Sequence, residues 1–391
     1  MKIAILTAEY PPYISGGVGT FSYELTKKLA ELGHEVIVVT RSIRAGRRGD
    51  DGVRTFYLFS PNVPPRDVVY SLTRMRAIYN IIRREKPDVI HDVGNLAGYM
   101  PYVSKLAPVV STIHGSPTLE EIRRSLGGRD YVRSLLFKLS HVIPAKFTGS
   151  LAKLEVKRYV FVSKFAMWDT LRAVKDEELR KALLRRSRVV YNGVDTKALR
   201  EIANSVHDVD EGSVVFIGRL MEYKGVRWLV KAFKHVVDEL PGAKLHIVGD
   251  GPIYKDIKGL VNKLNLEKNV AMHGALPRTE AMRVLAKSMV LTHPSLAESF
   301  GIVIAEAYAM GKPVIAHKST YSYELVAETG AGLTINALNE REYAEAITQL
   351  LTDKNLYRRL SQRALEVSER FSVEAMVKGY LEVYREAINE A

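Results

Sequence analysis

The sequence predicts an α/β fold, with two doubly wound parallel-sheet domains in tandem. At 391 residues the chain exceeds what one hydrophobic core usually serves. Short apolar, β-branched runs alternate with amphipathic segments from end to end, which is typical of parallel sheets with crossover helices. The alternation stops in the polar stretch 204–213 and then begins afresh. We therefore expect two Rossmann-like domains, residues 1–195 and 196–372, followed by a terminal segment, 373–391.

The first domain is expected to contain six strands, separated mostly by helices. Its clearest helix is TFSYELTKKLAELG at 20–33, which ends at Gly33 as helices commonly end at glycine. The predicted strands are KIAILTA at 2–8, HEVIVVT at 34–40, TFYLF at 55–59, DVIHDV at 88–93, PVVSTIH at 108–114 and RYVFVS at 158–163.

Six further strands are expected in the second domain, again with helices between them. They are SVVFIGR at 213–219, AKLHIVGD at 243–250, NVAMHG at 269–274, MVLTHPS at 289–295, KPVIAHK at 312–318 and AGLTI at 331–335. The last segment, FSVEAMVKGYLEVYREAINEA at 371–391, is a long amphipathic helix with no strand after it. Such a helix needs another surface for its apolar stripe, so we expect it to cross back to the first domain.

The composition excludes several kinds of site. The chain has no cysteine, which excludes disulfides, thiolate nucleophiles and cysteine-ligated zinc. None of its ten histidines has the His-x-x-x-His or His-Glu-x-x-His spacing, so no metal site is indicated. No apolar stretch approaches the roughly 20 uncharged residues of a membrane span, and the first apolar run is too short for a signal peptide. We expect a cytoplasmic protein.

The net charge of +13 is unevenly distributed. Residues 120–190 contain 17 Lys and Arg against 8 Asp and Glu. Such a region can meet nucleic acid, an anionic membrane surface or a phosphorylated substrate, or it can be a solvated basic face. Of the binding roles we favour peripheral docking on an anionic lipid surface or a phosphorylated acceptor.

A glycine-rich stretch, YISGGVGTF at 13–21, follows the first predicted strand. We expect Gly16, Gly17 and Gly19 to take up φ values that other residues avoid and to bring the backbone close to a ligand. A helix that starts just after them would point its free N–H groups and its positive dipole end at an anion. A glycine-rich turn with nothing bound fits this stretch alone equally well.

Polar residues also follow other predicted strands, where α/β domains bind ligands. His114 ends the strand at 108–114, although a histidine there can also be purely structural. In GRLMEYKG at 218–225, Arg219 and Lys224 can clamp a diphosphate, the arginine by a bidentate fork and the lysine as a point charge. An exposed basic turn is the alternative for this pair.

The segment PSLAESFGIVIAEAYAMGKPVIA at 294–316 carries two glutamates, Glu298 and Glu306. We expect a helix to begin near Phe300, so that the eight residues between the glutamates span about 12 Å. A carboxylate pair for general acid and base catalysis sits closer, roughly 5 to 10 Å apart. The pattern therefore favours hydroxyl binding at two ends of an elongated ligand. The N–H groups of Phe300, Gly301 and Ile302 would form a second anion site between them.

These features together describe one kind of ligand. Two helix N-termini, two cations and two separated carboxylates suit a molecule with a diphosphate in the middle and hydroxyl-rich groups at both ends. A nucleotide sugar is such a molecule.

With these motifs in place, the chain resembles the retaining glycosyltransferases of family four, of the glycogen synthase-like group 1, which have the GT-B fold. The resemblance covers nearly the whole chain. It rests on GGVGTF, LAELGHEV, STIHG, VSKF, YNGVD, GRLMEYKG, HIVGDGP, HGALP and above all ESFGIVIAEAYAMGKPVIA at 298–316.

The resemblance implies roles for individual residues. Gly16 and Gly17 would donate N–H groups to the phosphate next to the sugar, and HGALP would lie close to the base. Glu298 would hold sugar hydroxyls and Glu306 the ribose hydroxyls. It implies that the catalytic residues are His114, which would contact the transferred sugar near the reacting carbon, together with Arg219, Lys224 and Glu298. The residues implied to bind the donor are Gly16, Gly17, Arg219, Lys224, Glu298, Ser299, Phe300, Gly301, Ile302 and Glu306.

The resemblance also implies a hexosyltransferase that uses a UDP-, GDP- or ADP-sugar as co-substrate, with no cofactor and no divalent metal. Retention would proceed by front-side attack, in which the leaving phosphate accepts the acceptor's proton, so no general base is expected. The acceptor would be a carbohydrate or a lipid-linked molecule. Glycogen and starch synthases carry a lysine before the paired glycines where this chain has Ser15, which puts glycogen synthesis in doubt.

Three other functions are open. A nicotinamide-dependent dehydrogenase is disfavoured because Ser22 replaces the third glycine of G-x-G-x-x-G and no acidic residue follows the second strand. A sugar-nucleotide epimerase would share the fold and the nucleotide contacts. A nucleic-acid-binding protein would rest on the basic region alone, without a recognised motif, so we expect no nucleic-acid partner.

Overall fold

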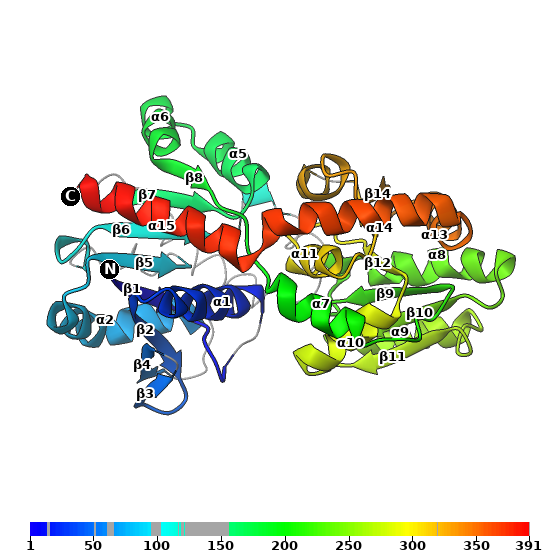
Figure 1. The fold of residues 1–391 in the computed structure, drawn as a ribbon, viewed down its shortest axis with the longest axis horizontal. Coiled ribbons are helices and arrows are strands. Elements are labelled where there is room, and N and C mark those ends of the chain that lie inside the picture. The colour runs from blue at the N-terminus through cyan, green and yellow to red at the C-terminus, as the bar shows by residue number, and fades with distance from the viewer. Residues whose placement is uncertain are drawn as a thin grey trace. The chain divides into compact units, whose positions relative to one another are not determined.

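The computed structural model describes residues 1–13, 16–50, 52–60, 66–94, 103–115, 117–118, 121, 156–318 and 320–390. The chain forms two compact units (Figure 1). Unit 1 comprises Met1–Pro117, Gly128–Gly193 and Val373–Ala391, and unit 2 comprises Thr118–Gly127 and Val194–Ser372. The divisions predicted from the sequence lie after residues 195 and 372.

Unit 1 contains an eight-stranded sheet in the order β3-β4-β2-β1-β5-β6-β7-β8. All neighbouring strands are parallel except β3 and β4, which are antiparallel. The strands are β1 (Lys2–Thr7), β2 (Glu35–Ser42), β3 (Gly46–Asp50), β4 (Val53–Phe59), β5 (Val89–Val93), β6 (Val109–Ile113), β7 (Val156–Phe161) and β8 (Ser187–Val189).

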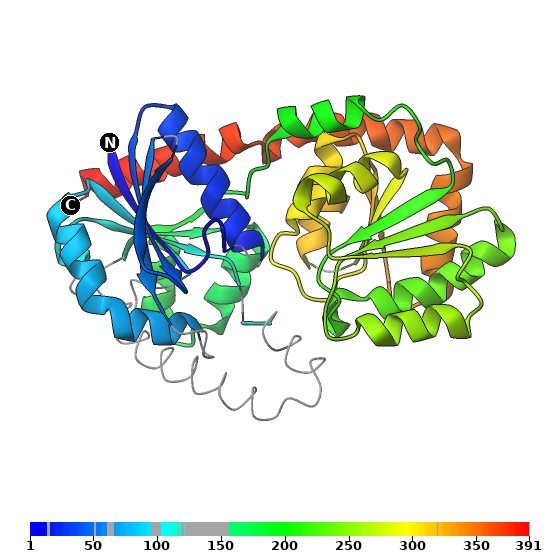
Figure 2. The ribbon, with the colours of Figure 1, turned by 90° about the horizontal axis from the view of Figure 1, so that it is seen from below.

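Helices cover both faces of this sheet (Figure 2). Because side chains alternate along a strand, Ile3 and Ile5 of β1 pack with helices α1 (Gly17–Glu31) and α15 (Val373–Asn389). Ala4 and Leu6 pack on the opposite face with α2 (Arg66–Glu85). Among the described residues of this unit, the remaining helices are η2 (Val103–Lys105), α5 (Lys164–Ala173) and α6 (Glu177–Arg186).

Helix α15 is joined to the sheet of unit 1 by a buried polar network. His91 on β5 hydrogen-bonds with Tyr384 through Nδ1 at 2.7 Å and with Thr112 on β6 through Nε2 at 2.7 Å. The Thr112 hydroxyl also contacts the Tyr380 hydroxyl at 2.9 Å. On β7, next to the edge strand β8, Arg158 pairs with Glu386 at 2.7 Å. The terminal helix is therefore part of the core of unit 1.

Unit 2 contains a six-stranded sheet in the order β11-β10-β9-β12-β13-β14, parallel throughout. Its strands are β9 (Ser213–Ile217), β10 (Lys244–Val248), β11 (Val270–Gly274), β12 (Val290–His293), β13 (Val314–His317) and β14 (Gly332–Ile335). Within its described residues from 194 to 372, the helices are α7 (Thr196–Asn204), η3 (Glu222–Lys224), α8 (Val226–Glu239), α9 (Tyr254–Lys263), α10 (Arg278–Lys287), α11 (Ile302–Ala309), α12 (Thr320–Ser322), η4 (Tyr323–Ala327), α13 (Glu340–Thr352), α14 (Lys354–Ser368) and η5 (Glu369–Phe371).

All twelve predicted strands are present, and two more were missed. Strand β3 has the sequence GRRGD, which lacks the apolar residues that indicate a strand. Strand β8 has only three residues and follows the basic helix α6 directly. Both lie at the edges of the sheet in unit 1, where a strand can form with little burial.

Candidate functional site

The site in unit 2 is built on two loops that pack closely together, one after β9 and one after β12. Gly225 has a φ of +77°, and a Cβ atom there would lie 2.3 Å from the carbonyl oxygen of Pro294. Glycine is therefore required both by the backbone conformation and by the close approach. The Leu296 N–H also donates to the Tyr223 carbonyl at 2.8 Å. These contacts hold the end of η3 against the loop that leads to α11.

This packing brings three charged or titratable side chains together. Lys224 Nζ forms an ion pair with Glu298 Oε2, and each side chain is about one-seventh exposed (16% and 14%). His293 Nε2 lies 3.8 Å from the same carboxylate oxygen, and the ring is almost fully buried. Lys224 and Glu298 were expected to bind different parts of a ligand, and the structure pairs them with one another.

His293 was missed by the sequence analysis, although its position offered a signal. It ends β12 just as His114 follows β6, so the strand-end rule that selected His114 applied to it equally. Burial, and next the Lys224 charge, lower the pKa of His293 to about 4, while Glu298 opposes the shift. The imidazole is therefore neutral at physiological pH.

The other predicted residues of these loops differ in exposure. Arg219 follows β9 and is exposed to solvent. Ser299 is buried, and the Phe300 ring is buried against Phe371 with ring centroids 5.9 Å apart. The Phe300 side chain is thus part of the core, and only its backbone can contribute to an anion site.

Helix α11 begins at Ile302, two residues later than expected. Gly301 forms its N-cap with a φ of +80°, a conformation that favours glycine. Glu298 therefore lies in the loop before the helix, and the length of about 12 Å expected for a continuous helix does not apply. The helix N-terminus itself is present where the anion site was expected.

Glu306 is buried on α11 and has a partner that the sequence analysis did not predict. The Arg278 guanidinium, at the start of α10, lies 2.8 Å from Glu306 Oε1. Burial raises the pKa of the Glu306 carboxyl, and Arg278 opposes this shift. Arg278 directly follows HGALP, the motif expected near the base, which was the available signal.

In unit 1 the glycine-rich stretch forms the start of α1. Gly16 is the N-cap, with an extended backbone (φ −170°) and no atom within 4 Å of an added Cβ. Neither Gly17 nor Gly19 has a positive φ. The expectation that these glycines adopt φ values other residues avoid is therefore wrong. The helix starts within the glycine stretch, at Gly17, and not just after it as expected, and its first N–H groups have no partner within the helix itself.

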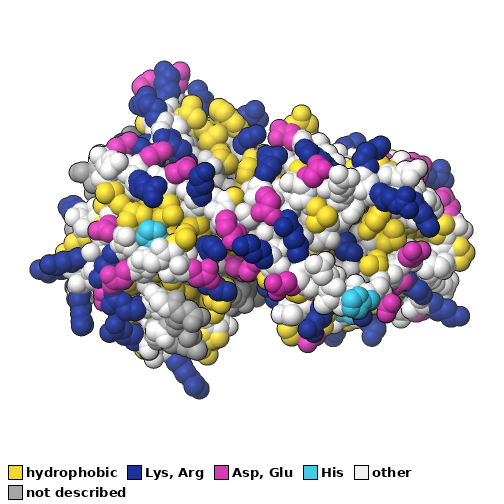
Figure 3. All heavy atoms as spheres, viewed as in Figure 1, with side chains coloured by type: hydrophobic (Ala, Val, Ile, Leu, Met, Phe, Trp, Pro, Cys, Tyr) yellow, Lys and Arg dark blue, Asp and Glu magenta, His cyan; other side chains and the backbone are white. Residues whose placement is uncertain are grey.

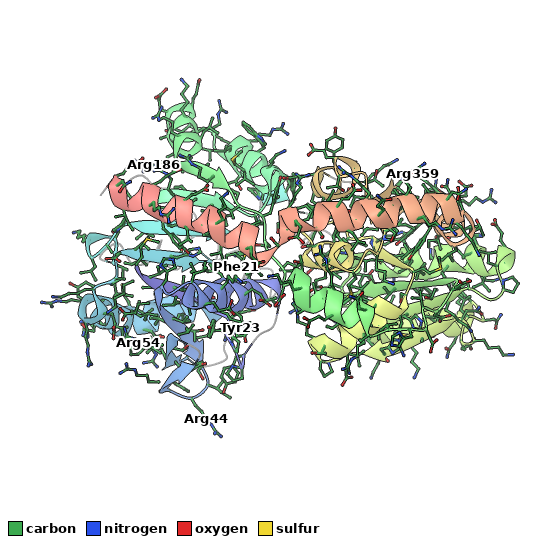
Figure 4. The ribbon with its side chains drawn as sticks, in the orientation of Figure 1. Phe21, Tyr23, Arg44, Arg54, Arg186 and Arg359 are labelled. Atoms are coloured by element: carbon green, nitrogen blue, oxygen red, sulfur yellow. The ribbon has the colours of Figure 1, made fainter. Side chains whose placement is uncertain are left out.

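His114 lies directly after β6 and packs against α1. Its ring is 4.8 Å from the Phe21 ring in an edge-to-face arrangement. Phe21 is buried on α1, beside α15, where its ring is also 5.6 Å from that of Tyr380 (Figure 4). Burial lowers the pKa of His114 to about 4, so this imidazole is also neutral.

The predicted site residues thus form two sets, one in each unit. Unit 1 holds Gly16, Gly17 and His114; unit 2 holds Arg219, Lys224, Glu298, Ser299, Phe300, Gly301, Ile302 and Glu306. Within the described ranges no group of three or more His, Cys, Asp or Glu is placed to hold a metal ion. No helix among the described residues is long and apolar enough to span a membrane.

The basic region is described only in part. Residue 121 and residues 156–190 are described, and the remainder of the predicted region 120–190 lies outside the described residues. The described part includes α5 and α6, and no residue of α6 is buried.

Two family models match the chain. Residues 15–198 match the model described as Glycosyltransferase Family 4, and residues 199–367 match the one described as glycosyl transferases group 1. An uncharacterised glycosyltransferase of Methanocaldococcus jannaschii is 28% identical, with 99% of this chain and 98% of the relative aligned. The N-acetyl-alpha-D-glucosaminyl L-malate synthase of Bacillus anthracis is 26% identical, covering 100% of this chain and 98% of the relative.

Solved structures of similar fold cover the whole length of the chain. Sucrose-phosphate synthase from Thermosynechococcus elongatus superposes with a TM-score of 0.76 at 21% identity, covering 100% of both chains. Anabaena HepE, in complex with UDP-glucose, gives a TM-score of 0.73 at 19% identity, covering 98% of this chain and 99% of that one.

Proposed function

This chain belongs to the glycosyltransferases of family 4 and group 1 and has the GT-B fold, and from that premise we propose that it moves a hexose from a nucleoside-diphosphate sugar to a hydroxyl group of a carbohydrate or lipid-linked acceptor. The observation that carries this proposal is the pairing of Lys224 with Glu298 in the loop before α11. A cation, a carboxylate and a helix N-terminus gathered at strand ends suit a phosphorylated sugar.

In the proposed reaction the diphosphate leaves with growing negative charge. Lys224 and the exposed Arg219 would neutralise this charge, and the N–H groups at the start of α11 would add to the effect. Two cations and a helix end can do the electrostatic work of a divalent metal, so we propose that the transfer needs none. The structure of HepE with UDP-glucose supports a nucleotide sugar as the donor.

The carboxylates would bind the two ends of the donor. Glu298 would accept hydrogen bonds from sugar hydroxyls, and Glu306 would accept them from the ribose. Because Arg278 already pairs with Glu306, we propose that Arg278 helps to keep this buried carboxyl ionised and ready to accept.

The residues of unit 1 would act on the sugar side of the donor. Gly16 and Gly17 would offer backbone N–H groups to the phosphate next to the sugar, and neutral His114 would hydrogen-bond the sugar near its reacting carbon. We propose that the configuration is retained by front-side attack, with the leaving phosphate taking the acceptor's proton.

The donor class can be tested with a thermal-shift panel of UDP-, GDP- and ADP-sugars beside NAD and NADP, in EDTA. A ligand at 100 times its Kd stabilises a protein by roughly 2.7 kcal/mol, which a melting curve resolves. We expect one nucleotide sugar to raise the Tm, and Glu306→Ala to abolish the shift.

The matched control is Glu345→Ala, which removes an exposed glutamate on α13 and should leave the shift intact. A shift with only a nicotinamide cofactor, or with no member of the panel, would contradict the proposal. A nucleotide-sugar shift that required a divalent metal would contradict its metal independence. An epimerase would convert the donor without acceptor, which product analysis would reveal.

We also propose that α5 and α6 form a peripheral contact with an anionic membrane surface. Trp168 and Leu184 are 49% and 42% exposed there. Hydrophobic side chains lie beside basic ones over these helices (Figure 3). An exposed apolar group with a basic rim suits the interface of an anionic bilayer, where each basic side chain contributes about 1 kcal/mol.

Co-sedimentation with phosphatidylcholine vesicles, with and without phosphatidylserine, tests this contact. Arg185→Glu/Arg186→Glu on α6 should weaken binding to the anionic vesicles at least about tenfold. Arg358→Glu/Arg359→Glu on α14 makes the same charge change elsewhere and should have little effect; Arg186 and Arg359 are labelled in Figure 4. Equal loss in both variants would point to net charge alone, and no binding by the wild type would remove the proposal.

A further inference from the structure

His293 is a buried titratable group for which the proposed reaction has so far given no role. It ends β12 and is 3% exposed. Among the described residues neither of its ring nitrogens has a hydrogen-bond partner. Buried polar atoms are usually paired, so an unpaired imidazole of this kind calls for an explanation.

The surroundings of the ring direct it toward the Glu298 carboxylate. One side of His293 packs edge-to-face against Tyr321, with ring centroids 5.8 Å apart. A Cβ atom at Gly301 would lie 3.3 Å from His293 Nε2, a tight contact that the glycine at the N-cap of α11 avoids. Glu298 Oε2 is 3.8 Å from the same nitrogen, which is too long for a hydrogen bond.

Lys224 competes for that carboxylate. It contacts Glu298 Oε2, the oxygen that also lies nearest His293. A diphosphate bound at this site would attract Lys224 strongly, because it offers more negative charge than one carboxylate does. Glu298 would then lose its cation while it remains largely buried, which is costly unless another group replaces the lysine.

We propose that His293 is a positioning residue, which binds a proton from solvent and holds Glu298 as an imidazolium–carboxylate pair when a diphosphate takes Lys224. This inference rests on the proposed function for the identity of the anion. In this role His293 holds the Glu298 carboxylate where it can accept hydrogen bonds from the sugar hydroxyls.

The charges that face His293 decide whether its pKa rises or falls when Lys224 is withdrawn from Glu298. They are Lys224 from η3 and Glu298 from the loop before α11, while Tyr321 from α12 adds a neutral ring. Burial and Lys224 lower the pKa of His293, and Glu298 raises it. Withdrawal of Lys224 removes one lowering influence and leaves the carboxylate, so the pKa must rise.

The first experiment needs no ligand. Histidine NMR titrations of the wild type and of Lys224→Met, with the His293 resonance assigned from its loss in His293→Gln, measure the effect of withdrawing the lysine. We expect the pKa of His293 to rise by about one unit or more in Lys224→Met. The resonance of His235, on α8, serves as the internal control. An unchanged His293 would overturn the inference.

The second experiment keeps every native residue near His293 and covers the case in which Lys224→Met does not fold. Calorimetric titration of the wild type with UDP at about pH 6, in buffers of different ionisation enthalpy, measures proton uptake on binding. We expect uptake by the wild type and its loss in His293→Gln, whose amide keeps a donor near Nε2. Uptake that persists in His293→Gln would overturn the inference. Absence of UDP binding would count against UDP as the nucleotide, and the NMR titration would still decide the role of His293.

Discussion

At the scale of single residues, two anions compete for an ion pair with Lys224. The structure pairs it with Glu298, and the proposed diphosphate would compete for it. A partly buried lysine loses little by exchanging one anion for another, because its desolvation has already occurred. The strong attraction of the diphosphate for Lys224 is offset by the loss of the ion pair with Glu298, so we expect Lys224 to contribute little to the net binding of the donor. It should contribute more to the step in which leaving-group charge appears.

Lys224→Ala tests this division. We expect kcat to fall about 100-fold or more, as for other groups that stabilise a developing anion, with KM for the donor changed less than about tenfold. The control is Lys231→Ala, which removes a half-exposed lysine paired with Glu340 on α13. If Lys224→Ala kept the wild-type kcat, the assignment of Lys224 to the leaving group would be wrong.

The sequence predicted the places of the candidate residues better than it predicted their partners. Arg219, Lys224 and His114 follow apolar strands, as expected. Partners such as Arg278 for Glu306 come from a different loop, and no spacing rule links the two positions. Conformation was also hard to predict, since Gly301 has a positive φ whereas Gly16 does not.

At the scale of elements, the apolar runs predicted the strands because burial on both faces of a parallel sheet requires them. The same criterion missed β3, whose sequence GRRGD has no apolar residue. Helix α15 illustrates what periodicity can and cannot provide. Its apolar stripe indicated that it needed a surface, but the chain of hydrogen bonds from Tyr384 through His91 and Thr112 to Tyr380 depends on the fold.

At the scale of the whole molecule, buried histidines make the two units differ in their response to acid. In unit 1 His91 is buried and His114 partly buried, and burial lowers their pKa values to about 3 and about 4 from 6.5. In unit 2 the strongest shift of this kind is that of His293, to about 4. Burial also raises the pKa of Glu306 in unit 2, which has the opposite effect on the stability of the folded unit in acid.

The sign of the effect follows from proton binding. Below about pH 6.5 an unfolded histidine binds a proton that the folded one does not, so each buried histidine lowers the free energy of unfolding as the pH falls toward its folded value. At about pH 5 each contributes a loss of about 2 kcal/mol. The raised pKa of Glu306 makes the folded unit 2 take up a proton earlier, which offsets part of its loss.

We therefore expect acid to destabilise unit 1 more than unit 2. Native-state hydrogen exchange between about pH 7.5 and about pH 5 can measure this, once the intrinsic exchange rates are corrected for pH. The opening free energies of amides in β1 and β5 should fall by up to about 2 kcal/mol more than those in β9 and β12. The lowered pKa values of His273 and His317 add to the loss in unit 2 and reduce this difference. His91→Gln keeps a neutral polar side chain in the network and should remove most of that difference. Equal losses in the two units would show that the buried histidines do not control acid stability.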